Sequence, residues 1–165
     1  EIGIHGGSIR VYISRKGMYP INSNLMKIIS EEEENKIFDI QRLNKFANDV
    51  ELHREKILAL LYRLKSEDAL IVGVSAPAKG MTLLNYCHIG PELLNFVTEK
   101  SQLKIGKYTP GLHIPVVPDS ALLEEKPDYA LLLAWNFADE IMENLSEFRK
   151  NGGKFIIPIP EPHIV

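Results

Sequence analysis

The chain contains a single cysteine, Cys87, among 165 residues. One cysteine can form neither an internal disulfide nor a zinc site of the CxxC type within the chain. Long apolar runs are also missing: none approaches the roughly 18 to 20 residues that span a bilayer, and no secretory signal opens the sequence. We therefore expect a cytoplasmic protein with no membrane partner and no metal site in this chain.

Neither sign of charge dominates. The net charge at pH 7 is −3, and basic and acidic residues are interspersed along the chain. Proteins that bind nucleic acid present a basic patch, which is absent here, so we exclude nucleic acid as a partner. Apolar residues make up 45% of the sequence, enough for the core of one ordinary domain. The chain opens at Glu1 rather than at methionine, and we expect a longer parent protein.

The pattern of apolar residues changes at about residue 36. Alternating apolar and polar residues within 1–16 predict a separate edge strand. Residues 17–36 are polar and include a run of four glutamates, which is typical of a linker. From residue 39 to about residue 65, apolar residues fall on one helical stripe and predict a long helix. The apolar face of this helix needs a partner.

Residues 37–165 are assigned to one domain because short apolar runs alternate there with helical or turn-rich segments. The predicted strands are 69–74, 94–99, 114–117, 129–134 and 154–159. Strands joined by right-handed crossovers form a parallel sheet, so we predict an α/β fold: a Rossmann-like, doubly wound, five-stranded sheet of order 3-2-1-4-5 with helices on both faces. Residues 136–150 predict a helix with Asn136 as its N-cap. The connection 99–113 shows no helical pattern and is expected to be irregular.

The turn after the first predicted strand reads GVSAPAKG, residues 73–80. In doubly wound sheets, ligands bind at the carboxyl ends of the strands, and small residues in such a turn let helix N–H groups face a phosphate. Gly73, Ser75 and Ala78 align with the dinucleotide pattern G-x-G-x-x-G/A. Any tight strand-to-helix turn favours the same small residues, so the turn alone leaves anion binding and plain packing equally open.

Two charged residues favour the binding interpretation. Glu99 stands 21 positions after Ala78, near the place of the acid that bonds ribose hydroxyls in the dinucleotide fingerprint. Lys79 would add a cation where the helix dipole already attracts a phosphate. A Walker A loop is excluded, because the lysine precedes Gly80 and Met81 follows instead of the required Ser or Thr.

Other polar groups follow the later strands. Trp135 and Asn136 come after the fourth predicted strand and Glu161 after the fifth, so they are candidates for a pocket wall. Packing also accounts for Trp135, and a helix cap for Asn136. No acid–base pair or nucleophile–base spacing stands out, and Cys87 in a helical pattern is typical of a small buried hydrophobe. We assign no catalytic residue.

Several separate segments resemble the C-terminal third of S-adenosylmethionine-dependent sugar C-methyltransferases. They are HGGSIRVYI, SAPAKGMTLLNYC, GKYTPGLHIPVVP, PDYALLLAWNFADEI and GGKFIIPIPE. Members of this family combine a zinc-binding module, a central methyltransferase domain and a C-terminal Rossmann-like domain, and this chain resembles the third part, with residues 1–16 as the tail of the central domain. The resemblance implies that S-adenosylmethionine, zinc and the catalytic base belong to the upstream domains, so this chain alone is expected to be inactive. It carries no E/D-x-G-x-G motif for the methyl donor.

The resemblance implies that the domain helps to hold a nucleotide-linked deoxysugar, a thymidine diphosphate derivative, against the upstream methyltransferase domain. The residues then expected to face this substrate are Ser75, Ala76, Pro77, Ala78, Lys79, Gly80, Asn85, Glu99, Trp135, Asn136 and Glu161. The family turn reads GAPAKGN, so this chain departs from it at Ser75 and Met81, and His88 stands where the family has glycine. Two alternatives stay open: a structural domain that packs or forms a homodimer, and a dinucleotide-binding oxidoreductase domain suggested by Glu99.

Overall fold

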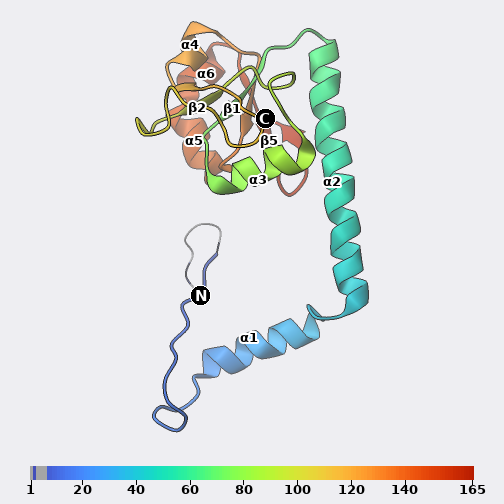
Figure 1. Ribbon diagram of the computed structural model, residues 1–165, viewed down its shortest axis with the longest axis vertical. Coiled ribbons are helices and arrows are strands. Elements are labelled where there is room, and N and C mark those ends of the chain that lie inside the picture. The colour runs from blue at the N-terminus through green and yellow to red at the C-terminus, as the bar shows by residue number, and fades with distance from the viewer. Residues whose placement is uncertain (1, 3–6) are drawn as a thin grey trace. The chain divides into compact units, whose positions relative to one another are not determined.

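The structure, a computed structural model, describes residue 2 and residues 7–165 (Figure 1). The chain forms two compact units, Glu1–Leu52 and His53–Val165. Helix α2 (Ile40–Ser66) runs through the boundary and contributes residues to both units. No helix within the described residues is both long and apolar enough to cross a membrane.

The first unit contains helix α1 (Ser23–Glu34). The side chain of Asn22 caps its start by accepting a hydrogen bond from Asn24 N at 2.8 Å, and Asn35 Nδ2 closes its end on Glu31 O at 2.7 Å. This helix occupies most of the segment interpreted from the sequence as a linker, because glutamate is a good helix former and these caps satisfy both ends. The assignment of residues 17–36 as a linker between domains stays a prediction.

The strand expected within residues 1–16 is not formed over residues 9–14, whose backbone has no regular structure. An isolated antiparallel bridge joins Ile2 to Ser8, and residues 1 and 3–6 of the predicted strand lie outside the described residues. The alternating side chains are exposed, Ile13 by 92%. A strand needs a hydrogen-bonded neighbour, so alternation alone does not produce one. That this segment is the tail of an upstream domain stays a prediction.

The second unit contains a sheet of order β3-β2-β1-β4-β5-β6. The strands are β1 (Ile71–Val74), β2 (Val97–Glu99), β3 (Val116–Pro118), β4 (Tyr129–Leu132), β5 (Lys154–Ile157) and β6 (His163–Ile164). The first five are parallel and have the predicted order 3-2-1-4-5, which is confirmed. Strand β6 is an addition: it pairs antiparallel with β5, and its two residues are too short to give a sequence pattern.

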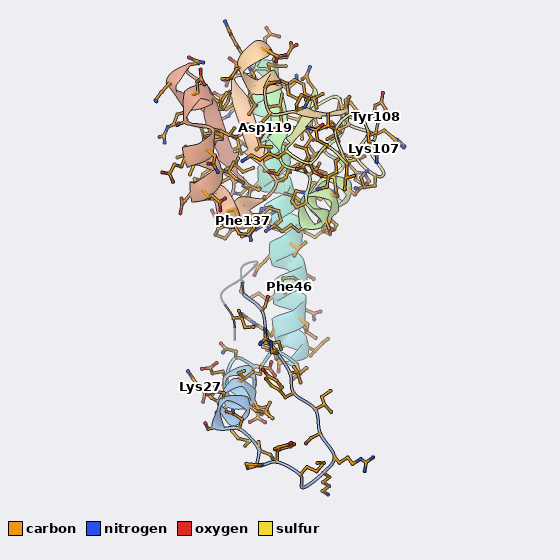
Figure 2. All side chains as sticks on the ribbon, turned by 90° about the vertical axis from the view of Figure 1, so that its left-hand side faces the viewer. Lys27, Phe46, Lys107, Tyr108, Asp119 and Phe137 are labelled. Carbon is orange, nitrogen blue, oxygen red and sulfur yellow. The ribbon has the colours of Figure 1, made fainter. Side chains whose placement is uncertain are left out.

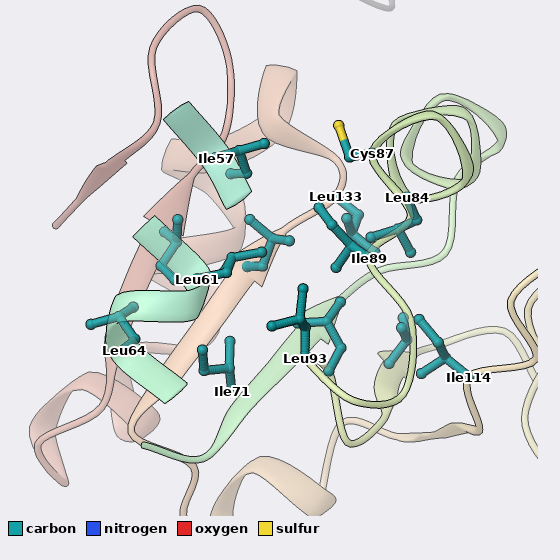
Figure 3. Close-up of a cluster of buried hydrophobic side chains, with 14 of the residues drawn as sticks. Ile57, Leu61, Leu64, Ile71, Leu84, Cys87, Ile89, Leu93, Ile114 and Leu133 are labelled. Atoms are coloured by element: carbon teal, nitrogen blue, oxygen red, sulfur yellow. The ribbon is translucent and has the colours of Figure 1, made fainter. Parts of the chain in front are cut away.

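Helices cover both faces of this sheet, as predicted for a doubly wound fold. They are α3 (Ala78–Cys87), α4 (Ala121–Glu124), the 3-10 turn η1 (Trp135–Phe137), α5 (Ala138–Asn144) and α6 (Ser146–Lys150). On one face, Ile57 and Leu61 of α2 pack with Leu84 of α3 and Ile71 of β1 (Figure 3). On the opposite face, Val72, Leu132 and Phe155 of the strands pack with Phe148 of α6, and residues of α4 and α5 join this core. Successive residues of β1 therefore point into two different cores.

The prediction of one helix over 136–150 capped by Asn136 is wrong in detail. The chain leaves β4 through η1, closed by the bond from Phe137 N to Ala134 O at 2.8 Å, and α5 begins after Phe137 with no side-chain cap. Asn136 therefore lies inside the 3-10 turn, and its Oδ1 is buried with no hydrogen-bond partner among the described residues. A second break falls at Leu145, between α5 and α6.

Candidate functional site

The β1–α3 turn, residues 75–80, lies at the switch point of the sheet, where β1 is flanked by β2 and β4. Ser75 has a left-handed backbone with φ of 68°, and its N–H bonds Thr98 O of β2 at 2.9 Å. Pro77 is the N-cap of α3 and gives no side-chain cap; the first helical bond runs from Met81 N to Pro77 O. The N–H groups of residues 78–80 precede that bond, so they face outward from the helix start.

Gly80 brings the start of α3 into close contact with the end of β4. A Cβ atom at Gly80 would lie 2.7 Å from Leu133 Cβ and 3.0 Å from Leu133 O. Gly73 has a similar role inside β1, since a Cβ there would lie 2.9 Å from Val97 Cγ2. Both glycines are thus required by helix and strand packing. They place the helix start directly over the carboxyl edge of the sheet.

Glu99, the last residue of β2, reaches back to the turn. Its Oε2 accepts a hydrogen bond from Ala76 N at 3.1 Å, and Oε1 accepts from Lys100 N and Ser101 N at 2.9 and 3.1 Å. Lys104 Nζ donates to Glu99 Oε2 at 2.9 Å and to Ala76 O at 2.9 Å. We call Glu99, Lys104 and Ala76 the clasp.

The clasp sets the charge state of Glu99. Burial by itself raises the pKa of this carboxyl, but the hydrogen bond from Lys104, the bonds from Ser101 and Ala76, and the charge of Lys104 together hold the pKa below its ordinary value. The side chain is only 13% exposed. Because both carboxylate oxygens are already bonded, Glu99 is not placed to accept from ribose hydroxyls in the way the dinucleotide fingerprint requires.

Lys79 lies beside two aromatic rings that follow β4. Its Nζ is 4.7 Å from the ring centre of Trp135 and 5.8 Å from that of Phe137. Partial burial lowers the pKa of Lys79, while the ring faces favour its charged form. Phe137 is 42% exposed and lies at the surface of the second unit (Figure 2). Lys79 and Trp135, two of the predicted site residues, are therefore brought together.

Asn85 and Glu161 lie apart from this cluster in their bonding. Asn85 Nδ2 donates to Met81 O at 2.8 Å and to Pro110 O at 3.1 Å, so this side chain holds a loop against α3. Glu161 is exposed and pairs with Lys56 of α2 at 2.8 Å; that hydrogen bond lowers the pKa of Glu161. Neither contact involves the β1–α3 turn.

Two residues with contacts at the site, Lys104 and Phe137, were missed from the sequence. Phe137 follows Trp135 and Asn136 at the end of β4, so its position in the chain was a usable signal. Lys104 gave none, because it lies in an irregular connection whose path does not follow from periodicity. The groups found here, outward N–H groups at a helix start and the ammonium of Lys79, are of the kind that can bind an anion.

The sheet order and the placement of this turn define the class of protein as a doubly wound, Rossmann-like α/β domain. Residues 3–160 match the family described as C-methyltransferase C-terminal domain, and the chain belongs to this family. It is also 36% identical over 163 residues to C-methyltransferase NovU of Streptomyces niveus. The alignment covers 98% of this chain but only 39% of NovU. The resemblance to the C-terminal domain of C-methyltransferases is confirmed.

Proposed function

We propose that this domain binds the diphosphate of a nucleotide-linked sugar and holds that substrate for the methyltransferase domain of its parent protein. The observation that carries the proposal is the start of α3, where the N–H groups of residues 78–80 precede the first helical bond and where Lys79 supplies an ammonium group beside Trp135. Helix N–H groups and the helix dipole both favour negative charge at this position. Family membership and the name of NovU support a role within a C-methyltransferase.

The aromatic groups beside Lys79 fit the other half of such a ligand. The ring of Trp135 and the exposed ring of Phe137 offer apolar surface next to the cation, on which a nucleotide base can stack. A dinucleotide cofactor is disfavoured, because Glu99 is committed to the clasp. The oxidoreductase alternative thereby loses the residue that suggested it.

The residues of this chain do not fit S-adenosylmethionine or zinc. No acid follows β1 in the β1–α3 turn, and the carboxylate at the end of β2 is fully hydrogen-bonded. Cys87 is the sole cysteine of the sequence and is buried. We propose that the methyl donor, the zinc and the catalytic base belong to other parts of the parent protein, and no chemical step is assigned to this domain.

Titration calorimetry with thymidine diphosphate tests the proposal, with Lys79→Met as the key variant. Loss of a charge-assisted contact costs about 1.5 to 3 kcal/mol, so affinity should fall by about tenfold or more. Lys154→Met is the matched control: Lys154 also lies beside a ring, 6.0 Å from Tyr129, but it opens β5 at the amino edge of the sheet. Absence of binding to the unmodified chain, or equal losses in both variants, would refute the proposal.

A second function, packing against another protein surface, is favoured by the first unit. None of its described residues is buried. Its exposed large apolar side chains include Ile13, Tyr19, Met26, Phe38, Leu43 and Phe46. Large apolar side chains that find no core within their own unit are candidates for contact with another protein surface. The upstream domain of the parent protein and a second copy of the chain are both partners that such a surface could take.

A further inference from the structure

The irregular connection between β2 and β3, residues 100–115, is tied to the β1–α3 turn through the clasp. Both backbone groups of Ala76 are used: its N–H donates to Glu99 at 3.1 Å and its C=O accepts from Lys104 at 2.9 Å. Ala76 is therefore held from both sides of its backbone. These two hydrogen bonds act on the residue directly after Ser75, whose left-handed conformation is unfavourable for a residue with a Cβ atom.

The same connection is tied to α3 at a second point. Pro110 O accepts from Asn85 Nδ2 at 3.1 Å, and the next residue, Gly111, has φ of 84°. A Cβ atom at Gly111 would collide with Asn85 Oδ1, so the backbone at Gly111 is in close contact with the side chain of Asn85. The β2–β3 connection thus touches both the turn and the helix that follows it.

The clasp also controls charge next to the candidate anion site. Glu99 is only 13% exposed, and Lys104 is the cation that neutralises it, at 2.9 Å. With both present, the pair has no net charge and does not repel an anion at the helix start. Without Lys104, a carboxylate bonded to Ala76 would stand unneutralised beside the N–H groups of residues 78–80.

We propose that Glu99 and Lys104 are positioning residues, which fix the β1–α3 turn and mask its one carboxylate so that the N–H groups of residues 78–80 can hold an anion. This rests on the proposed function of the turn. Neither residue touches the ligand in this arrangement. Both act through Ala76, and the path of the β2–β3 connection brings Lys104 within hydrogen-bond distance of Ala76 O.

Thymidine diphosphate affinity in Lys104→Met tests the masking role. Without Lys104, the Glu99 carboxylate should repel the diphosphate and the β1–α3 turn should be less ordered. Binding should weaken about tenfold, which corresponds to about 1.4 kcal/mol. The double variant Lys104→Met/Glu99→Gln removes the unmasked charge and should recover the part of the affinity that is lost to repulsion, and Lys104→Arg should bind nearly as the unmodified chain does. Purely structural roles would instead make the double variant at least as weak as Lys104→Met. Lys107→Met, in the same connection and at the surface (Figure 2), is the matched control and should bind normally.

Backbone amide hydrogen exchange without ligand tests the clasp independently of binding. Exchange at Ala76 should be faster in Lys104→Met and in Glu99→Gln than in the unmodified chain and Lys107→Met, with melting temperatures showing that each variant is folded. If the unmodified chain bound no thymidine diphosphate while Ala76 behaved in this way, the proposed function would fail and the clasp would stand. Unchanged exchange at Ala76 in both clasp variants would overturn the positioning role, as would normal affinity in Lys104→Met.

Discussion

Two residues of the second unit adopt a left-handed backbone at positions where the resemblance to sugar C-methyltransferases predicts glycine. Ser75 has φ of 68° in the β1–α3 turn, and His88 has φ of 55° at the C-cap of α3. Glycine is favoured in both settings because it has no Cβ atom to clash with the neighbouring carbonyl. At Ser75 and His88 the side chain therefore adds backbone strain, which at Ser75 is opposed by the bond to Thr98 O and by the clasp.

Ser75→Gly should stabilise the chain. Glycine removes the strain energy of the left-handed backbone in the folded state, and it adds conformational entropy to the unfolded state. The first effect is the larger, so the free energy of unfolding should rise by about 0.5 to 1 kcal/mol. Urea denaturation measures this. Ser120→Gly is the control, because Ser120 has φ of −55° and gains nothing from glycine; it should lower stability. A loss of stability in Ser75→Gly would show that the serine hydroxyl, and not the backbone, decides this position.

At the scale of elements, the predictable features were those set by local patterns. Apolar runs located the five parallel strands, and right-handed crossovers then fixed their order. The small residues of the β1–α3 turn were also read correctly as a close approach, which Gly80 shows against Leu133. The clasp could not be found in this way, because Lys104 reaches Ala76 across 28 residues of sequence, through a connection without a period.

The error at Asn136 has a different cause. An Asn before acidic residues is a good N-cap signal, yet the chain turns through η1 before α5 begins, so Asn136 lies one residue before the N-cap position, which Phe137 occupies. Capping patterns describe where a helix can start, but here a 3-10 turn closed by the bond from Phe137 N to Ala134 O comes first. Whether the chain starts a helix at Asn136 or first forms a 3-10 turn depends on tertiary packing at the end of β4, which the capping pattern does not contain.

The clasp should make stability depend on pH. The pKa of Glu99 is depressed in the folded chain, so its contribution is complete above the ordinary value of 4.5 and is lost as pH falls through the folded pKa. The difference in unfolding free energy between the unmodified chain and Glu99→Gln should be about 1 kcal/mol at neutral pH, because Lys104 is 48% exposed and partly screened.

Urea titrations at several pH values would measure that difference, which should shrink towards zero in acid and also fall at high salt. Glu161→Gln is a useful comparison. Glu161 has a depressed pKa as well, but its ion pair with Lys56 is exposed, so its effect on stability should be smaller. A difference for Glu99→Gln that stayed constant from neutral to acid pH would contradict an ionised clasp.

For the whole molecule, one helix shows how far a sequence pattern can go. The apolar stripe of α2 predicted a packed face along its full length. Ile57, Leu61 and Leu64 are indeed buried, whereas Leu43 and Phe46 on the same stripe are 48% and 66% exposed. Periodicity identifies an apolar helix face that packs against other apolar surface, but it does not show whether that surface belongs to this chain.

The core predicts that residues 53–165 fold on their own. Every fully buried hydrophobic side chain among the described residues lies at or beyond Ile57, and the retained part of α2 still covers the face lined by Leu84 and Ile71. Removal of residues 1–52 should therefore leave a cooperative melting transition within a few degrees of that of the full chain. Fluorescence of a dye that binds apolar surface should fall, because the exposed side chains of the first unit are gone.

A longer deletion provides the contrast. Residues 67–165 alone lack Ile57, Leu61 and Leu64, so one face of the sheet would be open to water and the cooperative transition should be lost. Sedimentation of the full chain and of 53–165 then separates the partners of the first unit: self-association confined to the full chain indicates a second copy, and two monomers favour another domain of the parent protein. If 53–165 failed to fold while the full chain melted cooperatively, the first unit would be part of the core, and its exposed apolar faces would need a different explanation.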